Sequence, residues 1–124
     1  MEAAQQDARI FLPNTKAYNK GTISQVWKCA SGAPLVEWKG LAIHFEDGWR
    51  DVDAEAAFKQ MNANNGVGTI VEVAGHAARY VPGSRDIGPQ LFVVLSDTMI
   101  EVEGAPSTSG DELQAIANSL RPDA

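Results

Sequence analysis

His44, His76 and Cys29 are the residues of this sequence best suited to metal or nucleophilic chemistry. A zinc site usually needs three or four nitrogen or sulfur ligands, so all three would have to converge from separate elements. A Cys–His pair would need an activated thiolate. Cys29 instead lies two residues after Trp27 in an alternating run, so both side chains point to the same face of the predicted strand. A buried and unreactive thiol is the common outcome there. The sequence therefore predicts no catalytic residue, no metal and no cofactor.

A cluster of acidic residues is the other candidate for metal binding, because hard cations take several carboxylate oxygens. It comprises Glu46, Asp47, Asp51, Asp53 and Glu55. A calcium loop of the helix–loop–helix type needs a glycine and a final glutamate, and the corresponding positions here carry other residues. The favoured interpretation is that Asp51 or Asp53 caps a helix and that Glu55 opposes its N-terminal dipole, which contributes about 1 kcal/mol.

Phosphate and nucleic-acid binding are disfavoured by both sequence order and charge. The run Gly66–Gly68 precedes a predicted strand, whereas a phosphate loop follows a strand and opens a helix. The run Ser107–Gly110 does precede a helix, but Asp111 and Glu112 would repel a phosphate there. The net charge of −6 also gives no general attraction to nucleic acid or to an anionic membrane.

Three tryptophans recur every eleven residues, at Trp27, Trp38 and Trp49, a spacing that could place indole rings around a ligand. The alternative is that they belong to the core or its rim. Residues of a ligand site in a pocket between the helices and the sheet would be Trp38, His44, Trp49 and His76.

The length of 124 residues predicts one domain, with residues 1–20 as a partly irregular N-terminal segment. Met1–Arg9 lacks the basic start and the apolar run of a secretory signal. The longest strongly apolar run, Leu91–Leu95, is too short to cross a bilayer. We therefore expect a chain without a membrane span. One cysteine is compatible with the cytoplasm and with an exported domain whose signal or anchor was removed, so the location stays open.

Alternation of apolar and polar residues predicts strands in the first half over Gly21–Cys29 and Leu35–Phe45. In the second, the apolar phase switches at Gly40, which indicates a bulge or a tight bend. A helix follows, because Ala54, Ala57, Phe58 and Met61 fall at helical spacing. Asn62–Gly68 ends this helix.

The second half repeats this order of elements, with strands predicted at Thr69–Val73, Ala77–Val81, Leu91–Leu95 and Met99–Glu103. Ser96-Asp97 between two of them is typical of a hairpin turn. Ser109 and Glu112 form a capping box before a final helix. The expected fold is α+β: an antiparallel sheet of about five to six strands with two helices packed on one face, in the order strands, helix, strands, helix.

Two runs of the sequence resemble the DUF4367-type domain: Val71–Ala78 (VEVAGHAA), a valine-rich strand that enters a Gly-x-x-Ala step, and Asp111–Leu120 (DELQAIANSL), a terminal helix. The resemblance covers about Gly21 to Leu120, although Val94 and Leu95 stand where the family commonly has a tryptophan. It implies an extracytoplasmic part of a bacterial lipoprotein or an anti-sigma-factor-like regulator, without established catalytic residues.

We therefore predict a non-catalytic interaction or sensory domain of a small bacterial protein, which binds a protein partner. The alternative is a small-molecule-binding domain or an enzyme, with a pocket between helices and sheet. Either one is compatible with a homo-oligomer formed through a sheet edge.

Overall fold

The computed structural model describes residues 10–28 and 33–122. It contains the helices α1 (Ala54–Asn65) and α2 (Gly110–Asn118) and a short 3-10 helix, η1 (Lys20–Thr22). The strands are β1 (Phe11–Leu12), β2 (Gln25–Lys28), β3 (Pro34–Trp38), β4 (Leu41–Glu46), β5 (Thr69–Val73), β6 (His76–Val81), β7 (Gln90–Leu95), β8 (Thr98–Gly104) and β9 (Arg121–Pro122). No helix within these ranges is long and apolar enough to cross a bilayer.

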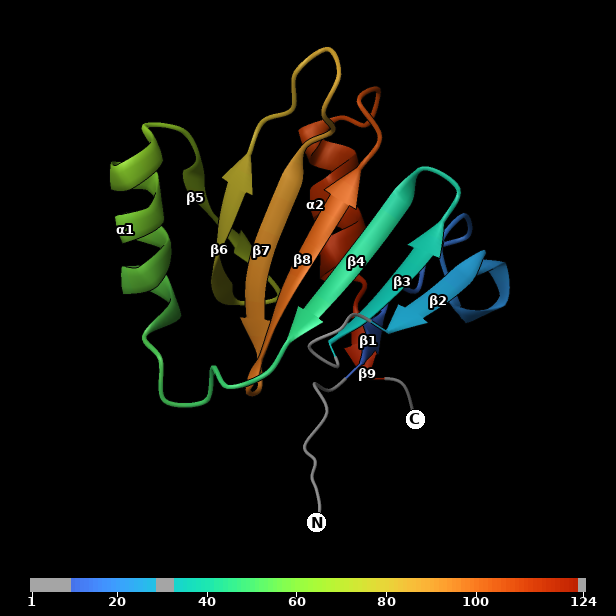
Figure 1. The fold of residues 1–124 in the computed structure, drawn as a ribbon, viewed down its shortest axis with the longest axis horizontal. Helices are drawn as coiled ribbons and strands as arrows, with labels where there is room; N and C mark the ends of the chain where they lie inside the picture. The colour runs from blue at the N-terminus through green and yellow to red at the C-terminus, as the bar shows by residue number, and fades with distance from the viewer. Residues whose placement is uncertain (1–9, 29–32, 123–124) are drawn as a thin grey trace.

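Seven of the strands form one antiparallel sheet in the order β2-β3-β4-β8-β7-β6-β5 (Figure 1). Strands β1 and β9 pair separately. Neighbours in the sheet are mostly neighbours in sequence, joined by hairpins. The exception follows β4, where α1 carries the chain to the far edge and β5 to β8 then return strand by strand. Strand β8 therefore pairs with β4 and joins the two halves of the sequence.

Helix α2 covers one face of the sheet and closes the main core. Alternate residues of each strand point toward it, because successive side chains of a strand point to opposite faces. The helix contributes Leu113, Ile116 and Ala117 to this core. The strands of the seven-stranded sheet contribute Val36, Trp38, Leu41, Ile43, Phe45, Val73, Ala78, Leu91, Val93, Leu95, Ile100 and Val102, and β1 contributes Phe11 and Leu12.

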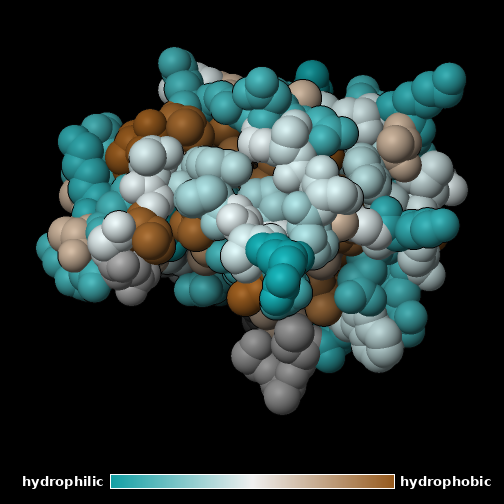
Figure 2. All heavy atoms as spheres, turned by 90° about the horizontal axis from the view of Figure 1, so that it is seen from above, coloured by the Kyte–Doolittle hydropathy of each residue, from teal (hydrophilic) through white to brown (hydrophobic). Residues whose placement is uncertain are grey.

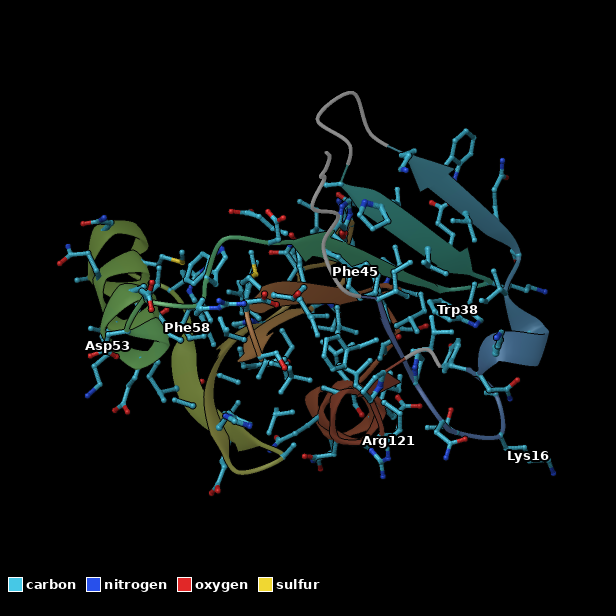
Figure 3. The ribbon with its side chains drawn as sticks, turned by 90° about the horizontal axis from the view of Figure 1, so that it is seen from below. Lys16, Trp38, Phe45, Asp53, Phe58 and Arg121 are labelled. Atoms are coloured by element: carbon cyan, nitrogen blue, oxygen red, sulfur yellow. The ribbon has the colours of Figure 1, made fainter. Side chains whose placement is uncertain are left out.

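Helix α1 packs on the opposite face, where its main contacts are with β5 and β6. Its Phe58 is fully buried, and Figure 3 shows this residue on the side of α1 that faces the strands. Arg79 of β6 bonds to Asn62 of α1, whereas the preceding residue, Ala78, belongs to the core under α2. Since adjacent strand residues point to opposite faces, α1 and α2 lie on opposite sides of the sheet.

The helix ends follow the capping chemistry of the sequence. Oδ1 of Asp53 accepts the N–H of Ala56 at 3.1 Å, so Asp53 is the N-cap of α1, as one of the two sequence alternatives predicted. Ser109 and Glu112 form the predicted capping box of α2, with bonds of 2.9 and 3.1 Å. Gly66 ends α1 in the left-handed conformation at φ 70°.

The expected α+β class with an antiparallel sheet is confirmed, and three details differ from the expectation. The sheet has seven strands rather than five to six, and the short β9 follows the last helix. The two helices do not share a face, because the alternating pattern does not say which face of a strand a given helix covers.

The turns also follow the sequence closely. Lys39-Gly40 forms a hairpin turn between β3 and β4, so the phase switch marks a tight bend between two strands. Ser96-Asp97 joins β7 to β8 as predicted. The strand predicted over Gly21–Cys29 is shorter in the structure, and all four residues of β2 are exposed. Cys29 lies outside the described residues.

Candidate functional site

Helix α1 leaves much of its face of the sheet without a covering helix. In Figure 1, α2 lies behind the sheet and no helix crosses the front of β3, β4, β8 and β7. We call this surface the open face. All but one of its side chains are half-buried, and Glu46 is exposed. From the strand registers its side chains are Leu35, Glu37, Ala42, His44, Glu46, Gln90, Phe92, Val94, Met99, Glu101 and Glu103.

Glu101 lies at the centre of this surface. The register places it directly between His44 on β4 and Phe92 on β7. Nε2 of Gln90 donates to Oε2 of Glu101 at 3.1 Å. Burial raises the pKa of the Glu101 carboxyl; His44 opposes this rise, and Glu103 and Glu46 add to it. The open face therefore concentrates carboxylates where water solvates them only partly.

Two tryptophans flank the open face, and each bonds to one of its glutamates. The indole Nε1–H of Trp27, on the edge strand β2, donates to Oε1 of Glu37 at 2.6 Å. The indole of Trp49, in the loop between β4 and α1, donates to Oε2 of Glu46 at 3.2 Å. These bonds fix the positions of two carboxylates and leave their charge in place. Aromatic rings thus stand at both sides of an acidic surface.

Arg79 on β6 points to the same side of the sheet as the open face, and its side chain contacts α1. Its Nε donates to Oδ1 of Asn62 at 2.6 Å, and its guanidinium lies 5.3 Å from the ring centroid of Phe92. Only 6% of the residue is exposed. Among the described residues, no ion pair neutralises a glutamate of the open face.

The four ligand-site residues proposed from the sequence lie in different surroundings. Trp38 is buried in the core, and its indole N–H donates to the carbonyl of Asn19 at 2.9 Å. His44 lies on the open face. Trp49 adjoins that face through Glu46, and its ring stacks on Phe58 with centroids 6.2 Å apart.

Trp38 and His44 line the same hollow of about 370 Å³, which is open to solvent at the β3–β4 turn. Glu37 and Glu103 also line it. His76 is exposed at the start of β6, three strands away from β4 in the sheet. The structure thus brings Trp38 and His44 to one hollow, and neither Trp49 nor His76 is among the residues that line it.

Sequence reasoning missed Glu37, Gln90, Glu101 and Glu103, which make up most of the polar surface around His44. A signal for the glutamates was available, since Glu101 and Glu103 alternate with buried apolar residues along β8. The acidic cluster of the sequence does not form one site: Glu46 lies on the open face, Asp53 caps α1, and Glu55 pairs with Lys59 at 2.9 Å. No group of ligands suited to a metal ion occurs within residues 10–28 and 33–122.

Comparison with known proteins finds a similar fold and assigns no activity. No protein-family model and no curated protein matches the chain. A solved structure from Bacteroides thetaiotaomicron VPI-5482 is similar, with a TM-score of 0.53 at 13% sequence identity. The match covers 81% of this chain and 42% of that one, so the chain spans less than half of the length of its structural neighbour. At this identity the likeness concerns the fold alone.

Proposed function

We propose that this protein is a non-catalytic interaction domain whose open face binds a partner segment that carries Lys or Arg side chains. The observation that supports this most is the charge of the open face. Glu37, Glu46, Glu101 and Glu103 lie on it without an ion-pair partner among the described residues. A cationic segment would supply the missing charge and steer the encounter.

The spacing of the glutamates fits an extended partner. Glu101 and Glu103 are two residues apart on one strand, so their side chains leave the sheet roughly 7 Å apart. Alternate side chains of an extended peptide have the same spacing. Leu35, Met99 and Phe92, which are half-buried on the same surface, offer apolar contact for the aliphatic stems of the Lys or Arg side chains. The resemblance to DUF4367-type regulators is in keeping with a partner-binding role.

A labelled synthetic peptide of alternating Arg and Val residues tests the proposal by fluorescence anisotropy. The triple variant Glu37→Gln, Glu101→Gln, Glu103→Gln should bind it roughly tenfold more weakly. A matched control, Asp51→Asn, Asp86→Asn, Asp111→Asn, removes the same number of charges from exposed positions elsewhere, and we expect it to bind like the parent protein. Equal losses in both variants would reduce the effect to net charge and sink the proposal.

Nuclear magnetic resonance adds the location of binding. Amide shifts should change on β3, β4, β8 and β7 when the peptide is added, and the affinity should fall with salt. A peptide with Glu in place of Arg should produce no shifts. Changes confined to α2 or to the β1–β9 pair would contradict the proposal.

A second candidate is supported by the hollow at the β3–β4 turn. Its volume is about 370 Å³, it is open to solvent, and Trp38, His44 and Glu103 line it. A small cationic ligand would fit its charge. Ligand-dependent tryptophan fluorescence tests this reading, together with a raised melting temperature, since a ligand at 100 times its Kd stabilises by about 2.7 kcal/mol. No shift across a panel of small amines would count against it.

A further inference from the structure

The two edges of the seven-stranded sheet differ in how their backbone groups are satisfied. At the β5 edge, Nε2 of Gln114 donates to the carbonyl of Glu72 at 2.9 Å, and Oδ1 of Asn118 accepts the N–H of Ala74 at 2.8 Å. Both side chains come from α2. An unprotected edge strand is a template for further strand pairing, and these two bonds occupy part of that template.

The β2 edge has no comparable protection. Its four residues pair one-to-one with β3, so the strand carries no bulge, and it contains no proline. Among the described residues, no side chain bonds to the backbone of β2. Lys28, at its end, is the single charged residue of the strand. The devices that usually keep edge strands apart are therefore few here.

Exposed apolar side chains also gather on this strand. Val26 is 59% exposed and Trp27 is 47% exposed, and they point to opposite faces of the sheet. The other large apolar residues with comparable exposure among those described, Val52, Val67 and Ile87, lie in three separate loops. Figure 2 shows another side of the molecule, the end above α1 and the strands. Hydrophilic residues cover much of this surface.

We propose that β2 pairs antiparallel with β2 of a second copy, so that two seven-stranded sheets become one continuous sheet in a twofold dimer. A twofold axis perpendicular to the sheet keeps each face on its own side. Residues directly opposite each other must then point to the same face, so their numbers are both odd or both even. Pairing centred on Val26 satisfies this condition.

In this register Val26 faces the same residue of the second copy, and Gln25 faces Trp27. The exposed valines bury each other, and the indole gains a neighbour from the second copy. The two Lys28 side chains lie at opposite ends of the pair, so the strand pairing brings no like charges together. A second copy is thus compatible in charge with this edge.

Sedimentation velocity of the full chain, from low micromolar to near millimolar concentration, measures the pairing. The expected result is a mass that rises from monomer to dimer with concentration. Val26→Lys places two ammonium groups face to face at the twofold axis and should weaken the dimer by at least about tenfold. Because Val26 is exposed in the single chain, this variant should keep the melting temperature that the parent shows when dilute.

Val67→Lys is the matched control, since Val67 is 49% exposed and lies outside the strand, and it should dimerise like the parent. Hydrogen exchange locates the contact: the amides of Gln25–Lys28 should exchange more slowly at high concentration, and those of β5 should not change. A protein that stays monomeric throughout would overturn the proposal. So would a Val26→Lys variant that dimerises like the parent, or protection confined to another surface.

Discussion

Nε of Arg79 lies 2.6 Å from Oδ1 of Asn62, and this bond joins α1 to the face of the sheet opposite α2. The guanidinium is buried and also lies over the ring of Phe92, so its position is fixed from the helix and from the sheet at once. This contact therefore lies at the border between the part of the sheet that α1 covers and the open face.

Asn62→Ala should lower the free energy of unfolding by about 2 kcal/mol, because the buried guanidinium loses its hydrogen-bond acceptor. Urea denaturation measures the change. Asn64→Ala is the control: Asn64 is exposed and accepts a bond from Gln60 on the surface of the same helix, so its loss should cost a few tenths of a kcal/mol. Similar losses for both variants would show that the bond to Arg79 contributes little.

Glu101→Gln should stabilise the protein at neutral pH. Burial, partly opposed by His44, raises the pKa of the Glu101 carboxyl above 4.5, so the folded state binds the proton more tightly than the unfolded state does. The stability that this proton contributes is complete below pH 4.5 and is lost as the pH rises through the folded pKa. The ionised carboxylate therefore destabilises the fold at neutral pH.

Chemical denaturation of parent and Glu101→Gln over a pH series checks this sign. The variant should be the more stable at pH 7, and the difference should shrink as the pH falls toward 4.5. Its amide can still accept the bond from Gln90. A variant that is less stable than the parent at neutral pH would contradict the assigned effect of burial.

Ser109→Ala should lower the free energy of unfolding by about 1 kcal/mol, because the N–H of Glu112 loses its partner at the start of α2. Ser107→Ala, at an exposed position in the turn before the helix, should leave stability unchanged. Thermal unfolding followed by circular dichroism compares the two. Equal melting temperatures for Ser109→Ala and the parent would argue against the capping box as a source of stability.

Gly75→Ala should destabilise the fold by about 1 kcal/mol through backbone strain alone. Gly75 has φ 82° in the turn between β5 and β6, and a methyl group there would meet no atom within 4 Å. Gly75→Asn should cost less, because Asn tolerates the left-handed region better. If Gly75→Ala and Gly75→Asn lower the free energy of unfolding equally, backbone strain at this turn does not explain the loss.

Local chemistry in the sequence predicted most of the element boundaries. Asp53 and Ser109 place the helix starts through bonds made within three residues, and Gly66 ends α1 for an equally local reason. The strands from Thr69 to Gly104 follow from alternation over a few residues each. These features depend on neighbours in the chain, so a single sequence is enough to predict them.

The candidate site was only partly predictable. His44 was singled out from the sequence, but its neighbour Glu101 is 57 residues further along the chain and reaches it through the pairing of β4 with β8. Trp38 and Trp49 were predicted to lie with it in a pocket between the helices and the sheet. In the structure one belongs to the core and the other adjoins the open face through Glu46.

The sequence by itself determined the α+β class, the helix caps, the turns and the two-residue alternation of the strands, because each depends on local conformational preference and on which residues avoid water. Only the tertiary structure decided that the two helices lie on opposite faces, that β2 is an exposed edge, and that four glutamates share one surface. These depend on strand order, and strand order is set by how the whole chain buries its apolar area rather than by any short stretch of it.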